Sequence, residues 1–545
     1  MTTHGAPDDR VVTLPQLLQR RAVDSPDSVF LRDVAGGQVS YVEAHQLALA
    51  DAASFGDFGV SEGDAVVTMI PNSVRGTLMW LALSYLRGIE VPINTEYRGL
   101  LLRHAVKVST AQTMVVDAEY LDQVLEIADE LPLELLLVLG PKCELPRQPF
   151  EVRWLPASEA RPEKLRSPYE ANAWDTAAVL FTSGTTGPSK GVVVPWGLVY
   201  SFASRLYPSG SLTADDIIYV PTASSHIGGK ALPMLAALLG AQIVIRGRFS
   251  ASAFWDEIRH FGCTAAALVG TMAAFLTKQG EPGPADRDHP LRQVAMTPLA
   301  DGEGFARRFG VRVCSFYGTT EVGFPLTTGW DIRDWHSCGR LDRTFPGYEV
   351  RLVDEHDIAV PTGTPGELIV RTAEPWTLNA GYLGMPEQTA SAWRNGWFHT
   401  GDLLTRDEQG NHFYLDRLKD AIRRRGENIS SFEVESYVSD HPDVLECAAI
   451  GVRSELAEEE VKVFVVPDKG RAIAPLQLHT FLASRMPKFM LPRFIEIVDR
   501  LPKTAATERV KKHELRALGI TPGTWDQQAF EHTDEPDRVA RRLGL

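Results

Sequence analysis

The chain has 545 residues, of which 44% are hydrophobic and 23% charged, and its formal net charge is −15. Because a single hydrophobic core rarely grows beyond about 250–300 residues, this length predicts at least two domains. The negative charge argues against a nucleic-acid partner, which usually needs a basic face, and against binding to an anionic membrane surface.

The N-terminal half of the chain alternates helix-like and strand-like patterns. The segment "TLPQLLQRRAVDSP" opens with a capping-type Thr13 and continues with leucines at helical spacing. "DAVVTMI" and "QTMVVD" have the pattern of buried strands, and "TLMWLALSYLRG" that of a buried helix closed by Gly88. The strand series continues through "AQIVIRG", "TAAALVG" and "VRVCSFYG". Such alternation predicts an α/β architecture with parallel sheets.

The pattern changes after about residue 335. "YEVRLVDEHDIAVPTGTPGELIVR" contains short strands separated by turn residues, which predicts a small β subdomain. Further on, "SFEVESYVSDHPDVLECAAIGV" and "EEEVKVFVVPD" predict an α+β unit. We therefore expect a large N-terminal domain over residues 1–415, a hinge at 416–419, a small mobile C-terminal domain over 420–518 and a polar tail over 519–545.

A loop rich in small residues, "FTSGTTGPSKG" at 181–191, directly follows the apolar run "AAVL". Small residues let backbone N–H groups approach phosphate oxygens, while hydroxyls and the single cation Lys190 add donors and charge. The loop is not a Walker A motif, because Lys190 lies at the wrong offset from the glycines. Taken alone, the stretch is also compatible with a polar hairpin.

Three further motifs narrow the choice. "SFYGTTEVG" places Tyr317 and Glu321 just after a strand, "GWFHTGDL" places Asp402 in a tight turn, and "DRLKDAIRRRGENIS" places Arg417 and Lys419 at the domain boundary. In order and spacing these motifs resemble the AMP-forming adenylating superfamily of acyl-CoA synthetases, luciferases and peptide-synthetase adenylation domains. The resemblance extends over roughly residues 13–518 and includes "GELIVR" and "GYLGMPEQT". The middle and C-terminal segments most resemble the carnitine–CoA-ligase-like and fatty-acyl–CoA-ligase branches.

The resemblance implies that these motifs bind ATP and Mg²⁺. The β- and γ-phosphates would be held by Thr182, Ser183, Gly184, Thr185, Thr186 and Lys190. Tyr317, with Gly318 and Thr319 beside it, would stack on adenine, and Thr320 would touch the α-phosphate. Glu321 would be the Mg²⁺ ligand, since a hard cation prefers carboxylate and phosphate oxygens. Asp402 would accept both ribose hydroxyls, and Arg417 would contact ribose or phosphate. Each residue also has a structural interpretation: Tyr317 as core, Glu321 as a surface carboxylate and Asp402 as a turn former.

The resemblance also implies an acyl site and a moving small domain. His226 in "PTASSHIGGKAL" matches the aromatic gate beside the acyl site, although a lone histidine is more often structural. Lys230, one helical turn further on, would either meet a substrate carboxylate or be a surface lysine. Lys419 matches the hinge, and Gly426 matches the glycine that lines the coenzyme A tunnel. The arginines at 423–425 would form a solvated face or attract the 3′-phosphate of coenzyme A.

One departure from the family pattern lies near the C-terminus. Members usually have a glycine–lysine pair whose lysine bridges the carboxylate and the α-phosphate, but this chain has Glu508 and Arg509 in "LPKTAATERVKKHELR". Arg509 keeps a positive charge, yet arginine and lysine are not interchangeable at a tight site. Our hypothesis is that Arg509 takes the role of this lysine, with Lys511 and Lys512 as alternatives. The glycine-rich segment that many members have beside adenine is also absent from "VAMTPLAD".

The leading functional hypothesis is a carboxylate–CoA ligase that acts through an acyl-adenylate and uses ATP, Mg²⁺ and coenzyme A. An acyl-adenylate is a mixed anhydride and reacts with a thiol without a protein nucleophile, so the absence of a G-x-S-x-G elbow is expected. One alternative is an adenylating enzyme with another acceptor, such as an amine or nitrite, as in diazotase-like biosynthetic relatives. Another is a non-catalytic relative that binds nucleotide and regulates. "ALVGTMAAFL" is mostly small and apolar, which favours a fatty or aryl acid.

The remaining expectations concern location and partners. The five cysteines are scattered, without a CxxC pair, which predicts reduced thiols in a cytoplasmic protein. The N-terminal "MTTHGAPDDRVV" has no apolar signal core, and the longest apolar region is too short and interrupted to span a bilayer. We expect small-molecule partners, namely a carboxylic acid, ATP and coenzyme A, and leave a homodimer open.

Overall fold

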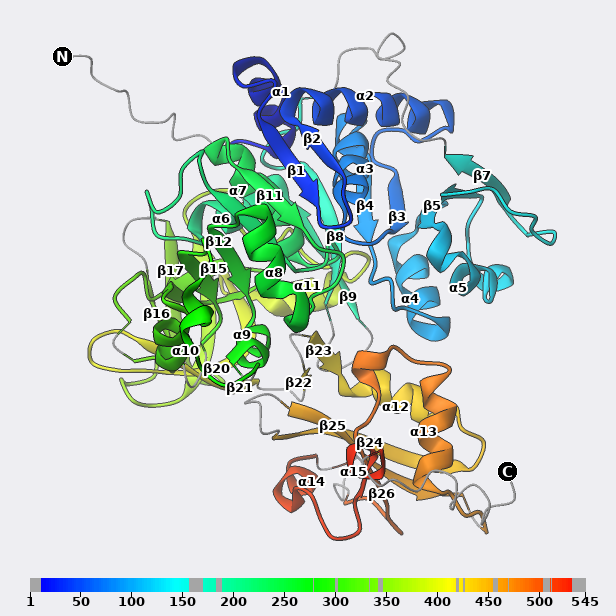
Figure 1. Ribbon diagram of the computed structural model, residues 1–545. Coiled ribbons are helices and arrows are strands. Elements are labelled where there is room, and N and C mark those ends of the chain that lie inside the picture. The colour runs from blue at the N-terminus through cyan, green and yellow to red at the C-terminus, as the bar shows by residue number, and fades with distance from the viewer. Residues whose placement is uncertain are drawn as a thin grey trace. The chain divides into compact units, whose positions relative to one another are not determined.

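The computed structural model describes residues 11–155, 170–182, 189–277, 279–298, 302–332, 334–341, 347–417, 421–424, 427–453, 459–468, 470–502, 510 and 512–531. Internal contacts divide the chain into two compact units (Figure 1). The first comprises Met1–Thr95, Leu102–Thr182 and Lys190–Leu418; the second comprises Glu96–Leu101, Ser183–Ser189 and Lys419–Leu545. Among the candidate-site residues that the structure describes, Lys512, the alternative to Arg509, belongs to the second unit, whereas those of the nucleotide and acyl sites belong to the first.

The first sheet of the first unit has, among the described residues, seven strands in the order β7-β6-β5-β3-β4-β8-β9. Its first six strands run parallel and the edge strand β9 antiparallel. All five residues of β6, "LLLVL", are buried, as expected of a parallel strand covered on both faces. The strands are β3 (Ala65–Met69), β4 (Ile89–Pro92), β5 (Thr113–Asp117), β6 (Leu135–Leu139), β7 (Glu151–Leu155), β8 (Thr176–Thr182) and β9 (Lys190–Pro195).

The second sheet is mixed. Its parallel part is formed by β1 (Val29–Asp33), β10 (Ile217–Val220), β11 (Gln242–Ile245), β12 (Ala265–Leu268), β13 (Gln293–Met296) and β14 (Arg312–Thr319), with β2 (Gln38–Ser40) antiparallel at one edge. From β14 onward the neighbours are antiparallel: β15 (Gly323–Thr327), β16 (Ser337–Leu341), β21 (His412–Arg417), β20 (Trp397–Arg406), β18 (Gly366–Thr372) and β17 (Tyr348–Val353), with β19 (Trp393–Arg394) beside β20. The α/β fold class is confirmed, but the β subdomain starts at Gly323 and continues the parallel sheet through β14.

One apolar core joins the two sheets of the first unit. It contains Val115 of β5 and Ile243 of β11 together with the stacked indoles of Trp80 and Trp196, whose ring centroids are 5.0 Å apart. These tryptophans belong to α3 (Val74–Tyr85) and α6 (Trp196–Arg205), and α7 (Ile227–Leu239) packs on α6. The other helices of this unit are α1 (Leu14–Asp24), α2 (Tyr41–Asp57), α4 (Gly99–Ser109), α5 (Leu121–Leu125), α8 (Ala251–Phe261), α9 (Gly270–Thr277), α10 (Gly302–Phe309) and α11 (Pro386–Ala392).

The second unit is an α+β structure. It contains the hairpin β22 (Ala421–Arg424) and β23 (Glu427–Ser430), a sheet in the order β24-β25-β26-β27, and helices α12 (Ser431–Ser439), α13 (Pro475–Ala483), α14 (Lys512–Leu518) and α15 (Gln527–Glu531). The sheet strands are β24 (Val444–Arg453), β25 (Glu459–Pro467), β26 (Phe494–Ile497) and β27 (Trp525–Asp526). Because β27 pairs with β26, the start of the polar tail belongs to the folded sheet. No helix among the described residues is long and apolar enough to cross a membrane.

Candidate nucleotide site

The two ends of the predicted phosphate loop lie side by side on the antiparallel hairpin β8–β9. Thr182 is the last residue of β8, Lys190 is the first of β9, and the two are paired in register. Next to Lys190, a Cβ on Gly191 would lie 2.9 Å from Val179 Cγ1, so this position needs a glycine. The predicted phosphate-binding residues Ser183, Gly184, Thr185 and Thr186 lie within the segment 183–188, which is outside the described part of the chain.

Tyr382 connects the predicted phosphate-binding lysine to the predicted metal ligand. Lys190 Nζ lies 4.5 Å from the centroid of the Tyr382 ring, and the Tyr382 hydroxyl donates to Glu321 Oε1 over 3.3 Å. A cation over the face of an aromatic ring is attracted by the ring quadrupole. The structure thus brings Lys190 and Glu321 to one aromatic side chain, to which the sequence motifs assigned no role.

The segment that carries Tyr382 is bound to the free edge of β9. Ala380 N donates to Val193 O over 2.9 Å, Val193 N to Gly381 O over 2.9 Å and Leu383 N to Gly191 O over 2.8 Å. The stretch "GYLGMPEQT" was the available sequence signal for this residue, because it belongs to the family resemblance. Its local composition alone does not indicate that it extends a sheet 190 residues away.

Asn379 attaches the same segment to the turn that carries Glu321. Its backbone N–H and its side-chain amide both donate to the Glu321 carbonyl, over 2.9 and 3.0 Å. Its side-chain oxygen in turn accepts from Gly381 N over 2.9 Å. Asn379 is buried, so these bonds satisfy polar groups that would otherwise be costly to bury. It is a second residue that motif reasoning missed.

The predicted residues Gly318, Thr319, Thr320 and Glu321 lie at the β14–β15 hairpin. Thr319 pairs with Gly323, and Glu321 N donates to Thr319 Oγ1 over 3.3 Å. A Cβ on Gly318 would lie 2.4 Å from Gly323 O, so only glycine fits there. The predicted residues of this hairpin are half-buried, which leaves part of each accessible.

The predicted adenine and ribose residues are in direct contact. The Tyr317 hydroxyl on β14 donates to Asp402 Oδ2 on β20 over 2.6 Å, a short bond as expected when the acceptor is charged. Both side chains are buried. Arg417 on β21 is the register partner of Asp402, so its backbone lies opposite the carboxylate-bearing residue. A hydrogen bond therefore joins Tyr317 to Asp402 although their strands are not adjacent in the sheet, and Arg417 pairs with Asp402 on the neighbouring strand.

His226 caps the N-terminus of α7, where it makes no side-chain cap bond. The turn that follows is tight, because a Cβ on Gly229 would lie 2.2 Å from Ala223 O. The structure therefore places His226 directly before α7 in the first unit. The backbone of the first helical turn approaches the preceding loop so closely that only glycine fits at position 229.

Both sequence interpretations of Lys230, as a surface lysine and as a partner of a substrate carboxylate, are wrong, because its side chain is buried and already paired. It is 1% exposed, forms an ion pair with Glu90 of β4, and its Nζ lies 4.4 Å from the Trp80 ring centroid. Thr68 Oγ1 donates to the other Glu90 oxygen over 2.8 Å. Burial lowers the pKa of the Lys230 ammonium, and the Glu90 carboxylate opposes this shift. A helical amphipathic pattern cannot reveal such a partner, which lies 140 residues away.

The chemistry of the donors fits a magnesium–nucleotide complex. No group of three or more His, Cys, Asp or Glu side chains that could hold a metal occurs in the described ranges. Mg²⁺ is usually bound through one or two carboxylates plus substrate phosphates and water, and Glu321 provides one carboxylate beside Lys190 and Tyr382. Lys419, Gly426 and Arg509 lie outside the described residues, so their predicted roles stay predictions.

The family models and relatives that this chain resembles match it over most of its length. The model described as AMP-binding enzyme matches residues 18–383, and the one described as AMP-binding enzyme C-terminal domain matches residues 433–507. A crotonobetaine/carnitine–CoA ligase of Salmonella arizonae is 31% identical over 488 residues, covering 87% of this chain and 92% of the relative. The amide bond synthetase McbA from Marinactinospora thermotolerans has a TM-score of 0.79 at 24% identity, covering 93% of this chain and 99% of its own. ATP-bound MatB from Rhodopseudomonas palustris has a TM-score of 0.64 at 26% identity, with 93% and 99% covered.

Proposed function

Because this chain belongs to the AMP-binding enzyme family, we propose that it is an ATP-dependent, AMP-forming carboxylate–CoA ligase. A carboxylate oxygen attacks the α-phosphorus of ATP, which gives an acyl-adenylate and pyrophosphate. The thiol of coenzyme A then attacks the acyl carbon, a thioester forms and AMP leaves. The observation that carries the proposal is the contact of Tyr317 with Asp402, next to the hairpin that bears Glu321.

The first half-reaction needs positive charge and hydrogen-bond donors around the leaving pyrophosphate. Lys190 and the loop that begins at Thr182 supply them, and Thr320 contacts the α-phosphate. Glu321 would hold Mg²⁺, which neutralises charge on the phosphates when it is bound. Asp402 accepts the ribose hydroxyls and Tyr317 covers the adenine, so the α-phosphorus is fixed relative to the acid. A relative 26% identical to this chain has been solved with ATP bound, which supports ATP as the nucleotide.

The second half-reaction needs a different set of residues around the adenylate. By the family resemblance, Lys419 would be the hinge of the small domain and Gly426 would line the coenzyme A tunnel. His226 gates the acyl side of the site. A charged segment at the domain boundary can change its backbone dihedral angles, as a hinge between two domain orientations requires. The compartment is the cytoplasm, which is supported by five cysteines that are all free thiols in the structure.

A screen of pyrophosphate release over carboxylic acids tests the function. Fatty and aryl acids, together with crotonobetaine and carnitine, are offered with ATP and Mg²⁺, with and without coenzyme A, amines and nitrite. We expect an acyl-CoA product, identified by mass spectrometry, for at least one acid. A product that forms with an amine or nitrite but never with coenzyme A would assign the chain to a non-CoA acceptor. If none of the acids supports the exchange of pyrophosphate into ATP, the protein is non-catalytic.

Arg509 is proposed to replace the lysine that the family uses at this position. In the same assay, Arg509→Ala is expected to lower the rate of pyrophosphate release by about 10- to 100-fold, the value of one hydrogen bond to a charged group. Arg509→Lys should retain activity, while Lys512→Ala, at the first residue of α14, tests the alternative cation and should change the rate little, because Lys512 is paired with Glu435 and Ser431. A Lys512→Ala variant that loses activity while Arg509→Ala keeps it would transfer the role to Lys512.

A further inference from the structure

The turn that carries Asp402 is a bulge between two neighbouring strands. In the β18–β20 pairing, Glu367 faces Leu403 and Ile369 faces His399, so β20 uses two more residues than β18 over this stretch. The bulged residues include Gly401, whose φ of +72° lies in the left-handed region. Bulges of this kind re-aim a side chain, here that of Asp402.

A single carboxylate, that of Glu367, binds the bulge. Gly401 N donates to Glu367 Oε1 over 3.0 Å, which satisfies a backbone donor in the interrupted ladder. Thr400 completes the turn: its hydroxyl donates to Leu368 O over 2.6 Å and accepts from Asp402 N over 3.1 Å. The residue directly before Asp402 is therefore tied to the side chain of Glu367.

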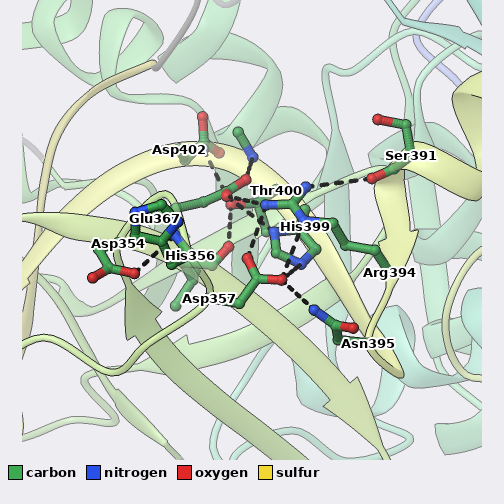
Figure 2. Close-up of polar contacts among 12 residues, drawn as sticks. Asp354, His356, Asp357, Glu367, Ser391, Arg394, Asn395, His399, Thr400 and Asp402 are labelled. Atoms are coloured by element: carbon green, nitrogen blue, oxygen red, sulfur yellow. Dashed lines mark hydrogen bonds and ion pairs between the residues drawn. The ribbon is translucent and has the colours of Figure 1, made fainter.

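The Glu367 carboxylate is itself held on its other oxygen. His399 Nδ1 lies 3.0 Å and an Arg394 terminal nitrogen 3.4 Å from Glu367 Oε2 (Figure 2). Arg394 also bonds Asp357 over 3.0 and 3.3 Å, and His399 Nε2 lies 3.8 Å from the same carboxylate. The side chains of His399 and Glu367 are only 3% and 12% exposed. Rotation of Glu367 away from Gly401 would break this buried network.

The cost of this network indicates a role other than stability. Glu367 and His399 lie on the face of the sheet that carries the small apolar cluster of Val353, Ile369 and Trp397. Burying a carboxylate there is expensive, and apolar residues would pack at lower cost. The network is connected to the candidate nucleotide site through Gly401 and the adjacent Asp402, whose Oδ2 accepts a hydrogen bond from the Tyr317 hydroxyl.

We propose that Glu367, held by His399, is a positioning residue that sets the direction of the Asp402 carboxylate toward the ribose of ATP. The inference rests on the proposed function, in which Asp402 accepts the ribose hydroxyls. Glu367 touches neither nucleotide nor metal in this role; it acts through Gly401. The property that it controls is therefore the recognition of the ribose, and not the affinity for phosphate.

Binding of ATP and of 2′-deoxy-ATP to the full chain, measured by calorimetry with Mg²⁺ present, tests the inference. The wild type is expected to prefer ATP by about 10- to 100-fold, the value of a hydrogen bond to a charged acceptor. In Glu367→Ala this preference should fall to within about threefold of unity, while the Kd for 2′-deoxy-ATP stays nearly unchanged. Glu367→Gln, which keeps an acceptor for Gly401 N–H, should recover part of the preference.

Two further variants separate the failure of this inference from that of the proposed site. Glu349→Ala removes an exposed carboxylate that pairs with Arg371 in the same sheet, and its nucleotide preference should equal the wild type's. If Asp402→Asn keeps the full preference for ATP, the ribose role of Asp402 is wrong. If Asp402→Asn loses the preference but Glu367→Ala keeps it, the positioning role is overturned. Should Glu367→Ala not fold, Glu367→Asp, one methylene shorter, replaces it in the comparison, and a preference equal to the wild type's would again overturn the positioning role.

Discussion

Replacing Lys190 with Ala is expected to lower kcat/KM for ATP by about 10²–10³-fold, the usual loss when one preorganised donor to a developing charge is removed. Lys190 begins β9 in register with Thr182, so its ammonium is held at the base of the predicted phosphate loop. Its contact with the Tyr382 ring further limits the positions that it can take. Steady-state kinetics of pyrophosphate release, with the acid found in the screen, measures the loss.

The control for this variant is Lys107→Ala, which removes an exposed lysine from α4 in the same unit. It should change kcat/KM for ATP by less than about twofold, because a lone surface charge acts weakly through water and salt. A Lys190→Ala enzyme within about threefold of the wild type would mean that the Lys190 ammonium does not bind the leaving phosphates.

Replacing Lys230 with Met is expected to lower the free energy of unfolding by about 3–5 kcal/mol, because the change leaves Glu90 buried and uncompensated. Both side chains of the pair are almost completely buried, at 2% and 3% exposure. Thr68 donates to one Glu90 oxygen, but one hydroxyl cannot offset the loss of the ammonium. Thermal unfolding of the full chain measures the effect as a lowered Tm.

The double variant Glu90→Met with Lys230→Met should recover most of this loss, since replacing both partners of a buried pair by apolar residues is often neutral. Arg371→Met, which breaks the exposed pair with Glu349, is the matched control and should cost less than about 1 kcal/mol. If Lys230→Met is as mild as Arg371→Met, the buried pair contributes little and its geometry has another purpose.

The elements of the parallel sheets could be predicted from the sequence because each carries its signal locally. "DAVVTMI" and "QTMVVD" became β3 and β5, and "TLMWLALSYLRG" became α3, since unbroken apolar runs reflect burial on both faces. The way the antiparallel strands join the second sheet could not be predicted. It depends on the pairing of Ser337 with Phe413, which no local pattern encodes.

In the candidate site, too, some residues could be predicted from the sequence and others could not. Glu321 and Asp402 could be named because their motifs resemble a family, and the structure places their segments near the end of β14. Tyr382, Asn379 and Glu90 could not be named, because their partners are contacts between distant segments. Lys230 shows how an ionisable residue on a helix is misjudged when its partner comes from another strand.

The attachment of the Tyr382 segment to β9 has a consequence for the order of folding. The bridge between Val192 and Tyr382 joins residues that are about 190 positions apart, so it closes a loop that contains the parallel strands β10 to β14 of the second sheet, but not β1. Contacts of such long range form late, because the chain between them must first lose most of its freedom. A nascent chain that ends before Tyr382 would therefore contain the segment 182–190 without the aromatic side chain that contacts both Lys190 and Glu321.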